Sequence, residues 1–117
     1  MADSFQKILL SGSTNGIGIP INATTSGSAN TIHTAAATNL DECWISFVNN
    51  SGADAVVTLA IGGTGSTNLF SLTIPAGRGL VSCISGLTFT GSVVIKAYAS
   101  VTGAIVAYGF VNRIVTV

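Results

Sequence analysis

The sequence predicts an all-β fold: an antiparallel β-sandwich of about eight strands, with either jelly-roll or immunoglobulin-like topology. Three observations lead to this fold class. Apolar residues form short runs rich in Val, Ile and Thr. These runs recur about every ten residues and are separated by turn clusters of Gly, Ser and Asn. Residues that favour helices are scarce, and charged residues make up only 7% of the chain.

The first part of the chain is expected to be looser than the remainder. A strand over 5–10 is followed by loops at 11–16 and 23–30 that are rich in Ser, Thr and Gly, and only weak strands are expected at 17–22 and 31–36. Such segments offer little apolar surface for burial. We therefore expect residues 1–40 to form an extended, loosely packed N-terminal arm with the first strands. Residues 41–117 are expected to form the sandwich core of a single domain.

The strongest strand patterns lie in the core segment. Residues 43–48 and 55–61 alternate between two faces and are separated by a turn cluster at 49–52. Further strands are expected at 69–74, 80–84, 87–90, 93–99 and 104–115. Pro75-Ala76-Gly77 fits a turn in which Gly takes a positive φ. The linker 100–103 is typical of a hairpin, so the last two strands are expected to pair antiparallel and to form much of the core.

The apolar residues suggest that the chain associates with other molecules. The segment 104–108 has no polar member, so it is either covered on both faces or meets another subunit on its outer face. A net charge of zero and a mean hydropathy of +0.67 also favour association. Trp44 is expected in the core, although with Tyr98 and Tyr108 it could form a platform on which sugars stack.

Two classes of partner are disfavoured by composition. The four basic residues are isolated from one another, whereas nucleic-acid binding needs clustered Lys and Arg, so we expect no nucleic-acid partner. No apolar run approaches the roughly 20 residues of a membrane-spanning helix, and the N-terminus does not read as a signal peptide, so no membrane partner is expected.

The sequence offers no convincing catalytic, cofactor-binding or metal site. Residues 62–66 lack the Lys-Ser/Thr ending of a phosphate loop. Asp41 and Glu42 are adjacent, so in a strand they point to opposite faces, and we expect them at a solvated strand start. His33 is expected to be a loop or interface residue, because no Gly-x-Ser-x-Gly nucleophile elbow accompanies it.

Two further residue types have structural interpretations. Cys43 and Cys83 lie in apolar runs and are expected to be small buried hydrophobic residues without a disulfide. Arg78 and Arg113 are lone charges beside apolar strand residues. Each is expected to form a salt bridge within the fold or at its surface, or to make an interface contact.

The order of these segments resembles a known class of protein. Phe47 to Leu59 reads as strand, Asn-x-Ser-Gly, strand; it leads to Ile74-Pro75-Ala76-Gly77, and the chain closes with Ala104 to Ile114. This layout, over roughly residues 43–117, is similar to the small β-sandwich virion proteins of tailed bacteriophages, especially capsid decoration or cement proteins. The resemblance implies a protein that binds the outside of an icosahedral shell, bridges capsomers and resists internal DNA pressure.

The resemblance also implies partners and a location. The partner would be the major capsid protein, the chain would be a homotrimer without a cofactor, and it would lie on the capsid surface after synthesis in the host cytoplasm. Seven residues are possible interface contacts: Phe5, Lys7, Ile32, His33, Arg78, Tyr108 and Arg113. The alternative is a receptor- or glycan-binding module of a fibre or tail, and a structural tail or connector component also remains open.

Overall fold

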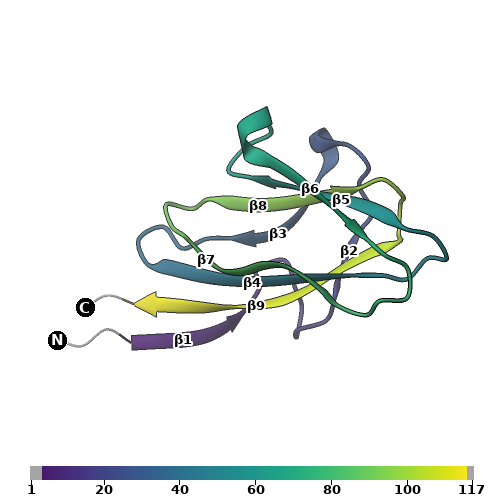
Figure 1. Cartoon of the computed structure of the whole chain (residues 1–117). Helices are drawn as coiled ribbons and strands as arrows, with labels where there is room; N and C mark the ends of the chain where they lie inside the picture. The colour runs from purple at the N-terminus through teal and green to yellow at the C-terminus, as the bar shows by residue number, and fades with distance from the viewer. Residues whose placement is uncertain (1–3, 116–117) are drawn as a thin grey trace.

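Two antiparallel sheets pack face to face in the computed structural model, which describes residues 4–115 (Figure 1). Sheet A contains β1 (Ser4–Leu9), β2 (Ile19–Ile21), β4 (Leu40–Asn49), β7 (Val81–Phe89) and β9 (Ile105–Val115). Sheet B contains β3 (Asn30–Thr34), β5 (Ala55–Ile61), β6 (Leu69–Ile74) and β8 (Val94–Ala99). The predicted antiparallel β-sandwich is confirmed.

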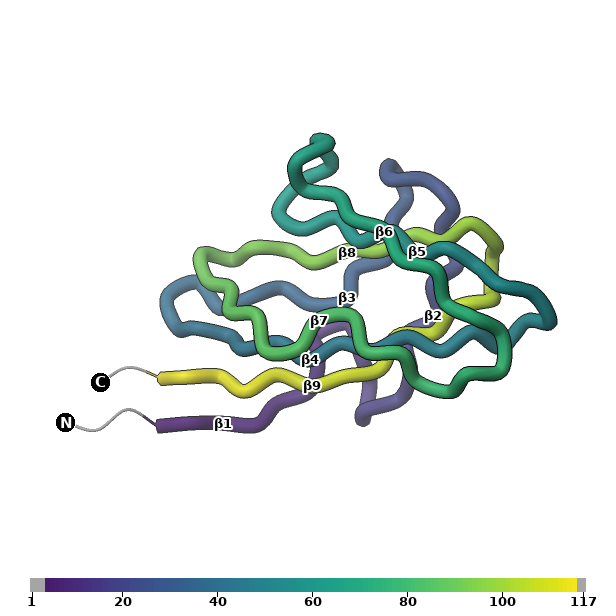
Figure 2. The backbone as a smooth tube through the Cα atoms, viewed as in Figure 1, coloured from purple at the N-terminus to yellow at the C-terminus, as the bar shows by residue number. Residues whose placement is uncertain are grey.

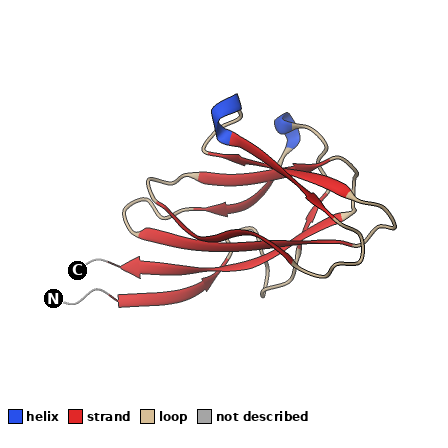
Figure 3. Cartoon of the chain, in the orientation of Figure 1, coloured by secondary structure: helices blue, strands red, loops and turns tan. Residues whose placement is uncertain are grey.

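Helical structure in the described residues is limited to two 3₁₀ turns, η1 (Ser26–Ser28) and η2 (Ser66–Asn68), drawn in blue in Figure 3. Among residues 4–115, no helix has the length and apolar character needed to cross a membrane. The scarcity of helix-forming residues therefore has its expected consequence for secondary structure.

The strand order places the longest strand, β9, inside sheet A. The order is β1-β9-β4-β7, and β2 also pairs with β9. Because β4 lies along one edge of β9 over residues 105–114, β1 and β2 share the other edge, β1 opposite 110–115 and β2 opposite 105–107. Sheet B has the order β3-β8-β5-β6.

The core lies between the two sheets and follows the alternation of the strands. On β4, Cys43, Ile45 and Phe47 are fully buried, as are Val57 and Leu59 on β5. The remaining strands contribute further buried apolar side chains, among them Ile21, Ile32, Ile74, Ile84, Ile95, Ile105, Ala107 and Val111. Burial of these side chains is the main stabilising contribution to the fold.

The prediction of a loosely packed arm over residues 1–40 does not describe residues 4–40. β1 and β2 pair with β9, and β3 pairs with β8, so this part of the chain contributes strands to both sheets (Figure 2). Three of its apolar residues, Leu10, Ile21 and Ile32, reach the core and are at most 1% exposed. The loops between them are polar, but these buried side chains fix the segment in place.

Two strand connections also differ from the prediction. The linker 100–103 is not a hairpin, because β8 belongs to sheet B and β9 to sheet A, so the linker crosses between the sheets. The expected strands 80–84 and 87–90 are one strand, β7, whose pairing with β4 shifts register at Gly86 (φ +86°). A positive φ at Gly in a shifted ladder is typical of a β-bulge, so Gly86 does not end the strand.

Two of the expected turns have the predicted character. Gly77 has a φ of +72°, as the Pro75-Ala76-Gly77 turn requires. At the turn after β4, the buried Asn49 donates from Nδ2 to the carbonyl oxygens of Ala53 and Ile74, each at 2.8 Å. Its Oδ1 accepts from the amide and the hydroxyl of Ser51 at 2.9 and 2.7 Å. The side chain of Asn49 thus ties this turn to the end of β6.

Candidate functional site

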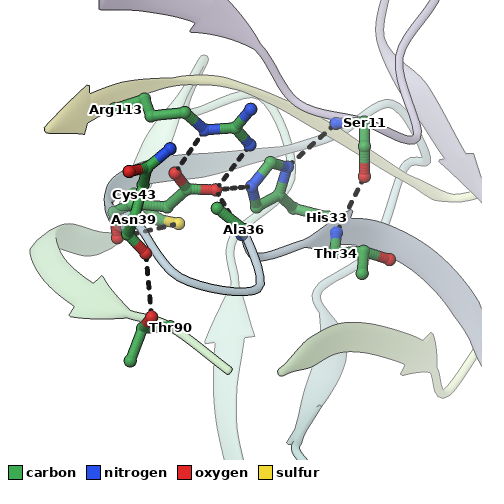
Figure 4. A network of polar contacts seen from close by, with 9 residues as sticks. Ser11, His33, Thr34, Ala36, Asn39, Cys43, Thr90 and Arg113 are labelled. Carbon is green, nitrogen blue, oxygen red and sulfur yellow. Dashed lines mark hydrogen bonds and ion pairs between the residues drawn. The ribbon is translucent and has the colours of Figure 1, made fainter. Parts of the chain in front are cut away.

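A network of polar contacts joins β3, β4 and β9 within the sandwich (Figure 4). Asp41 on β4 lies opposite Arg113 on β9, and Arg113 donates from Nε to Oδ1 at 2.7 Å and from Nη2 to Oδ2 at 3.0 Å. Oδ2 also accepts from the amide of Ala36 at 3.1 Å and lies 2.8 Å from Nε2 of His33. His33 is on β3 of sheet B, so this network joins the two sheets.

Asp41 is fully buried, and the prediction of a solvated strand start is wrong for this residue. Burial alone would raise the carboxyl pKa, but the hydrogen bonds from Arg113, His33 and Ala36 outweigh it. They lower the pKa of Asp41 from its ordinary 3.8 to about 2. The sequence pattern did identify Arg113 as one member of a salt bridge within the fold, and this interpretation is confirmed.

His33 is also fully buried, which corrects its assignment to a loop or interface. Its Nδ1 lies 2.9 Å from the backbone nitrogen of Ser11, and an amide can only donate. Nδ1 therefore accepts, and Nε2 carries the proton that it donates to Asp41. The Ser11 hydroxyl instead accepts from the amide of Thr34 at 2.7 Å. Ser, His and Asp side chains thus lie near one another, but the hydrogen bond from the Ser hydroxyl to the His ring that a hydrolase triad requires is not formed between Ser11 and His33.

Cys43 contacts this network through its thiol, which donates to the backbone carbonyl of Asp41 at 3.8 Å. Cys43 is buried and Cys83 is half-buried, and both are free thiols. Burial raises the pKa of Cys43 to about 12 and that of Cys83 to about 11, so both stay protonated at neutral pH. Within residues 4–115, no cluster of three or more His, Cys, Asp or Glu side chains could hold a metal ion.

The outer face of sheet A carries an aromatic surface. Trp44 on β4 lies opposite Phe110 on β9, and their rings are stacked with centroids 6.0 Å apart and planes 8° from parallel. The ammonium group of Lys7 on β1 lies 4.8 Å from the centre of the Phe110 ring, a cation–π contact. Trp44 is 37% exposed, so its predicted place in the core is wrong: it lies on the outer side of a strand whose two faces are both largely apolar.

The polar groups around Trp44 fix its orientation. Its indole nitrogen donates to Oε1 of Glu42 at 2.8 Å, and the amide of Asn112 donates to the same oxygen at 3.1 Å. These hydrogen bonds lower the pKa of Glu42, the one from Asn112 most. Asp41 and Glu42 thus point to opposite faces as expected, Asp41 into the sandwich and Glu42 onto its outer surface.

An open groove of about 400 Å³ lies on this face beside the aromatic residues. Its lining includes Trp44, Tyr108 and Phe110, with the hydroxyls of Ser46 and Ser82 as polar members. Trp44 and Tyr108, two of the three aromatic residues that the sequence suggested as a platform for sugars, therefore line the same groove. Tyr98 is separated from them because it lies on β8 in sheet B.

The outer face of sheet B is chemically different. Thr58 and Ser71 lie side by side on β5 and β6, with their hydroxyl oxygens 2.7 Å apart. Tyr98 on β8 lies on the other side of Thr58, and Lys96 follows in the next outward position. The two outer faces of the sandwich thus differ: the stacked aromatic pair and exposed aliphatic side chains lie on sheet A, whereas sheet B carries the hydroxyls of Thr58, Ser71 and Tyr98 beside Lys96 and Val56.

The seven possible contact residues fall into three groups. Phe5, Lys7 and Tyr108 lie on the outer face of sheet A, where Phe5 is 73% exposed. Arg78 is exposed in the loop between β6 and β7. Ile32, His33 and Arg113 lie within the sandwich: Ile32 is fully buried, and the other two form the Asp41 network.

Sequence reasoning did not assign two apolar members of this outer face, Leu9 and Phe110, to a contact surface. The period of two along β1 could have placed Leu9 with Phe5 and Lys7, since alternate residues share a face. Phe110 required the register of β9, which depends on pairing across the fold.

Comparison with known proteins adds no family assignment. No protein-family model matches the sequence, and no curated protein matches it significantly.

Proposed function

We propose that this chain is a non-enzymatic structural protein of a phage virion, a decoration or cement protein that binds the outer capsid surface and bridges capsomers. The observation that carries the proposal is the distribution of its side chains. Asp41, His33 and Arg113 hold the two sheets together, whereas one outer face presents exposed aromatic and aliphatic groups. Such a molecule is suited to act by surface contact and assembly.

The resemblance to small virion β-sandwiches supplies the partner in this proposal. The major capsid protein would be bound from outside the shell, after synthesis of the chain in the host cytoplasm. The resemblance further predicts a homotrimer at local threefold sites, a feature that is tested separately from shell binding. The rigid core formed by β4, β5, β8 and β9 suits a protein that must withstand mechanical load.

Capsid binding is the direct test. Purified protein is mixed with heads of the phage whose genome encodes the chain, prepared without this protein, and the heads are sedimented. We expect saturable binding at a fixed number of copies per head and greater resistance of the decorated heads to rupture by heat. Absence of the protein from the pelleted heads over micromolar concentrations would refute the proposal.

A glycan-binding module is a second candidate, favoured by the groove between Trp44 and Tyr108. An exposed indole offers a flat apolar face for a sugar ring, and the hydroxyls of Ser46 and Ser82 offer hydrogen bonds. A glycan array distinguishes the two functions. A reproducible glycan signal that Trp44→Ala abolishes would favour this candidate, and a blank array would favour capsid decoration.

A further inference from the structure

We propose that the outer face of sheet A binds the same face of a second copy of this chain, with a twofold axis running along β9. This inference rests on the register of three strands and on the charges that they carry. It does not depend on the proposed capsid function, because it concerns the contact between two copies.

The central row of this face carries one charge of each sign. Lys7 on β1 lies opposite Asn112 on β9, and Asn112 lies opposite Glu42 on β4. The row therefore runs from a cation on one side of β9 to an anion on the other. Asn112 lies between the two charges and donates a hydrogen bond to Glu42.

Apolar rows flank this charged row on both sides. Toward the C-terminal end of β9, Phe5 on β1 and Leu40 on β4 flank Ile114, and they are 73% and 39% exposed. Toward the N-terminal end of β9, Leu9 and Trp44 flank Phe110, and they are 47% and 37% exposed. Exposed apolar side chains in neighbouring positions on three strands are typical of a protein–protein interface.

A twofold rotation about β9 makes this pattern self-complementary. In the second copy, β1 then lies over β4 of the first copy and β4 lies over β1. Each row keeps its position along the strand direction. Lys7 of one copy then faces Glu42 of the second copy, and the reciprocal pair forms by symmetry. The apolar rows meet in the same way, so that Phe5 faces Leu40 and Leu9 faces Trp44. Stacked sheets pack about 30° from parallel, which these long side chains can accommodate.

The size of the overlapping face is that of a weak, reversible contact. The rotation brings only β1, β9 and β4 face to face, and because β1 has six residues and β9 eleven, the overlap is roughly 400 Å² per copy and roughly 800 Å² for the pair. Interfaces of this size are typical of transient association, so the dimer is expected to be concentration-dependent. Sheet B does not offer the same pattern, since Lys96 has no acidic counterpart among the described residues of that sheet.

The test is the mass of the full chain in solution, measured by sedimentation velocity over a range of concentrations. We expect twice the chain mass of 11.7 kDa, formed reversibly. A monomer at all concentrations overturns the inference. Three times the chain mass also overturns it, in favour of the threefold arrangement that the resemblance predicts.

Charge reversal identifies the contact. In a dimer of the Lys7→Glu variant, an anion at position 7 faces the anion Glu42 of the second copy. In a dimer of the Glu42→Lys variant, a cation at position 42 faces the cation Lys7. Each variant alone should therefore dimerise at least ~10-fold more weakly than the wild type. Mixed together, the two variants should form a heterodimer, because every reversed charge then meets an opposite one.

Lys96→Glu on the outer face of sheet B is the matched control and should dimerise as the wild type does. Circular dichroism of each variant confirms that it is folded. If the two reversed variants do not associate when mixed, although both are folded, the twofold arrangement is wrong. The dimer would cover the same face on which the capsid proposal rests, so binding to phage heads is measured separately with the same variants. Failure of the variants to associate refutes the dimer alone, and absence of the wild type from pelleted heads refutes the capsid proposal alone.

Discussion

Asp41→Asn removes the charge at the centre of the network that joins the sheets while keeping the size of the side chain. Asparagine retains one acceptor oxygen, but its amide group donates where Asp41 accepts. Arg113 or the Ala36 amide then loses its acceptor. Arg113 is 27% exposed on its side chain and can turn to solvent, whereas His33 cannot because it is buried. We expect a loss of about 2–3 kcal/mol in the free energy of unfolding at pH 7.

The pH dependence of stability gives a second estimate of what the Asp41 carboxylate contributes to the free energy of unfolding. The carboxyl pKa of Asp41 falls from 3.8 to about 2 on folding, and one pKa unit corresponds to about 1.4 kcal/mol, so the carboxylate contributes about 2 kcal/mol. Since the pKa of the folded state is the lower one, this stabilisation is complete well above pH 3.8. It is lost as the pH falls from 3.8 through the folded-state pKa of about 2, and it is absent only below that pH, where the carboxyl is protonated in both states.

The assay is urea unfolding followed by circular dichroism at pH 7, 5, 3 and 2. The wild type should lose about 2 kcal/mol over the acid range through this group, and Asp41→Asn should lack that part of the loss. Asp54→Asn is the control: this exposed carboxylate has one acceptor contact, to the Ala76 amide, which asparagine keeps. If Asp41→Asn is as stable as the wild type within about 0.5 kcal/mol, or keeps its full acid dependence, this account of the network is refuted.

Three further predictions concern single residues, each measured by the same unfolding assay. Gly109→Ala should cost about 3 kcal/mol or prevent folding, because a Cβ at this position would overlap the backbone carbonyl of Trp44; Gly27→Ala, where a Cβ meets nothing within 4 Å, should be nearly neutral. Asn49→Asp should cost about 3 kcal/mol at neutral pH, since a carboxylate would face two carbonyl oxygens, and a wild-type stability would contradict the assigned hydrogen bonds. Phe47→Ala should cost about 3–5 kcal/mol because the ring is fully buried, and an effect no larger than that of Phe5→Ala would contradict the placement of the core.

The parts of the fold that the sequence predicted are those with local signals. The alternation of β4 and β5 places Ile45, Phe47, Val57 and Leu59 in the core, and the period of two is sufficient for this. The turn at Gly77 was predicted correctly because its chemistry resides in adjacent residues.

The missed features depend on contacts that are distant in sequence. The linker 100–103 has the composition of a hairpin, but composition does not determine whether the next strand joins the same sheet or the opposite one. Gly86 resembles a turn residue and is a bulge, because β4 continues to pair on both sides of it.

The same reason limits the prediction of the candidate site. Arg113 lies 72 positions from Asp41, and only the pairing of β4 with β9 brings them together. Trp44 stands in a strand with apolar residues on both faces, so hydrophobicity alone could not tell which face is covered. Which face of β4 stays exposed depends on where sheet B packs against sheet A.

The position of β9 has a consequence for how the protein is made in the cell. This strand pairs with β1, β2 and β4, and it is the last strand of the sandwich to leave the ribosome. β4 and β7 can pair earlier, but β1 has its partner only in β9, and Ser4 meets Val115 at the far end of that ladder. Pairing between segments so distant in sequence is slow, because the chain loses loop-closure entropy before the stabilising contacts form. Completion of sheet A must therefore wait for the synthesis of β9, and the strand that finishes the fold is also the axis of the face on which two copies would meet.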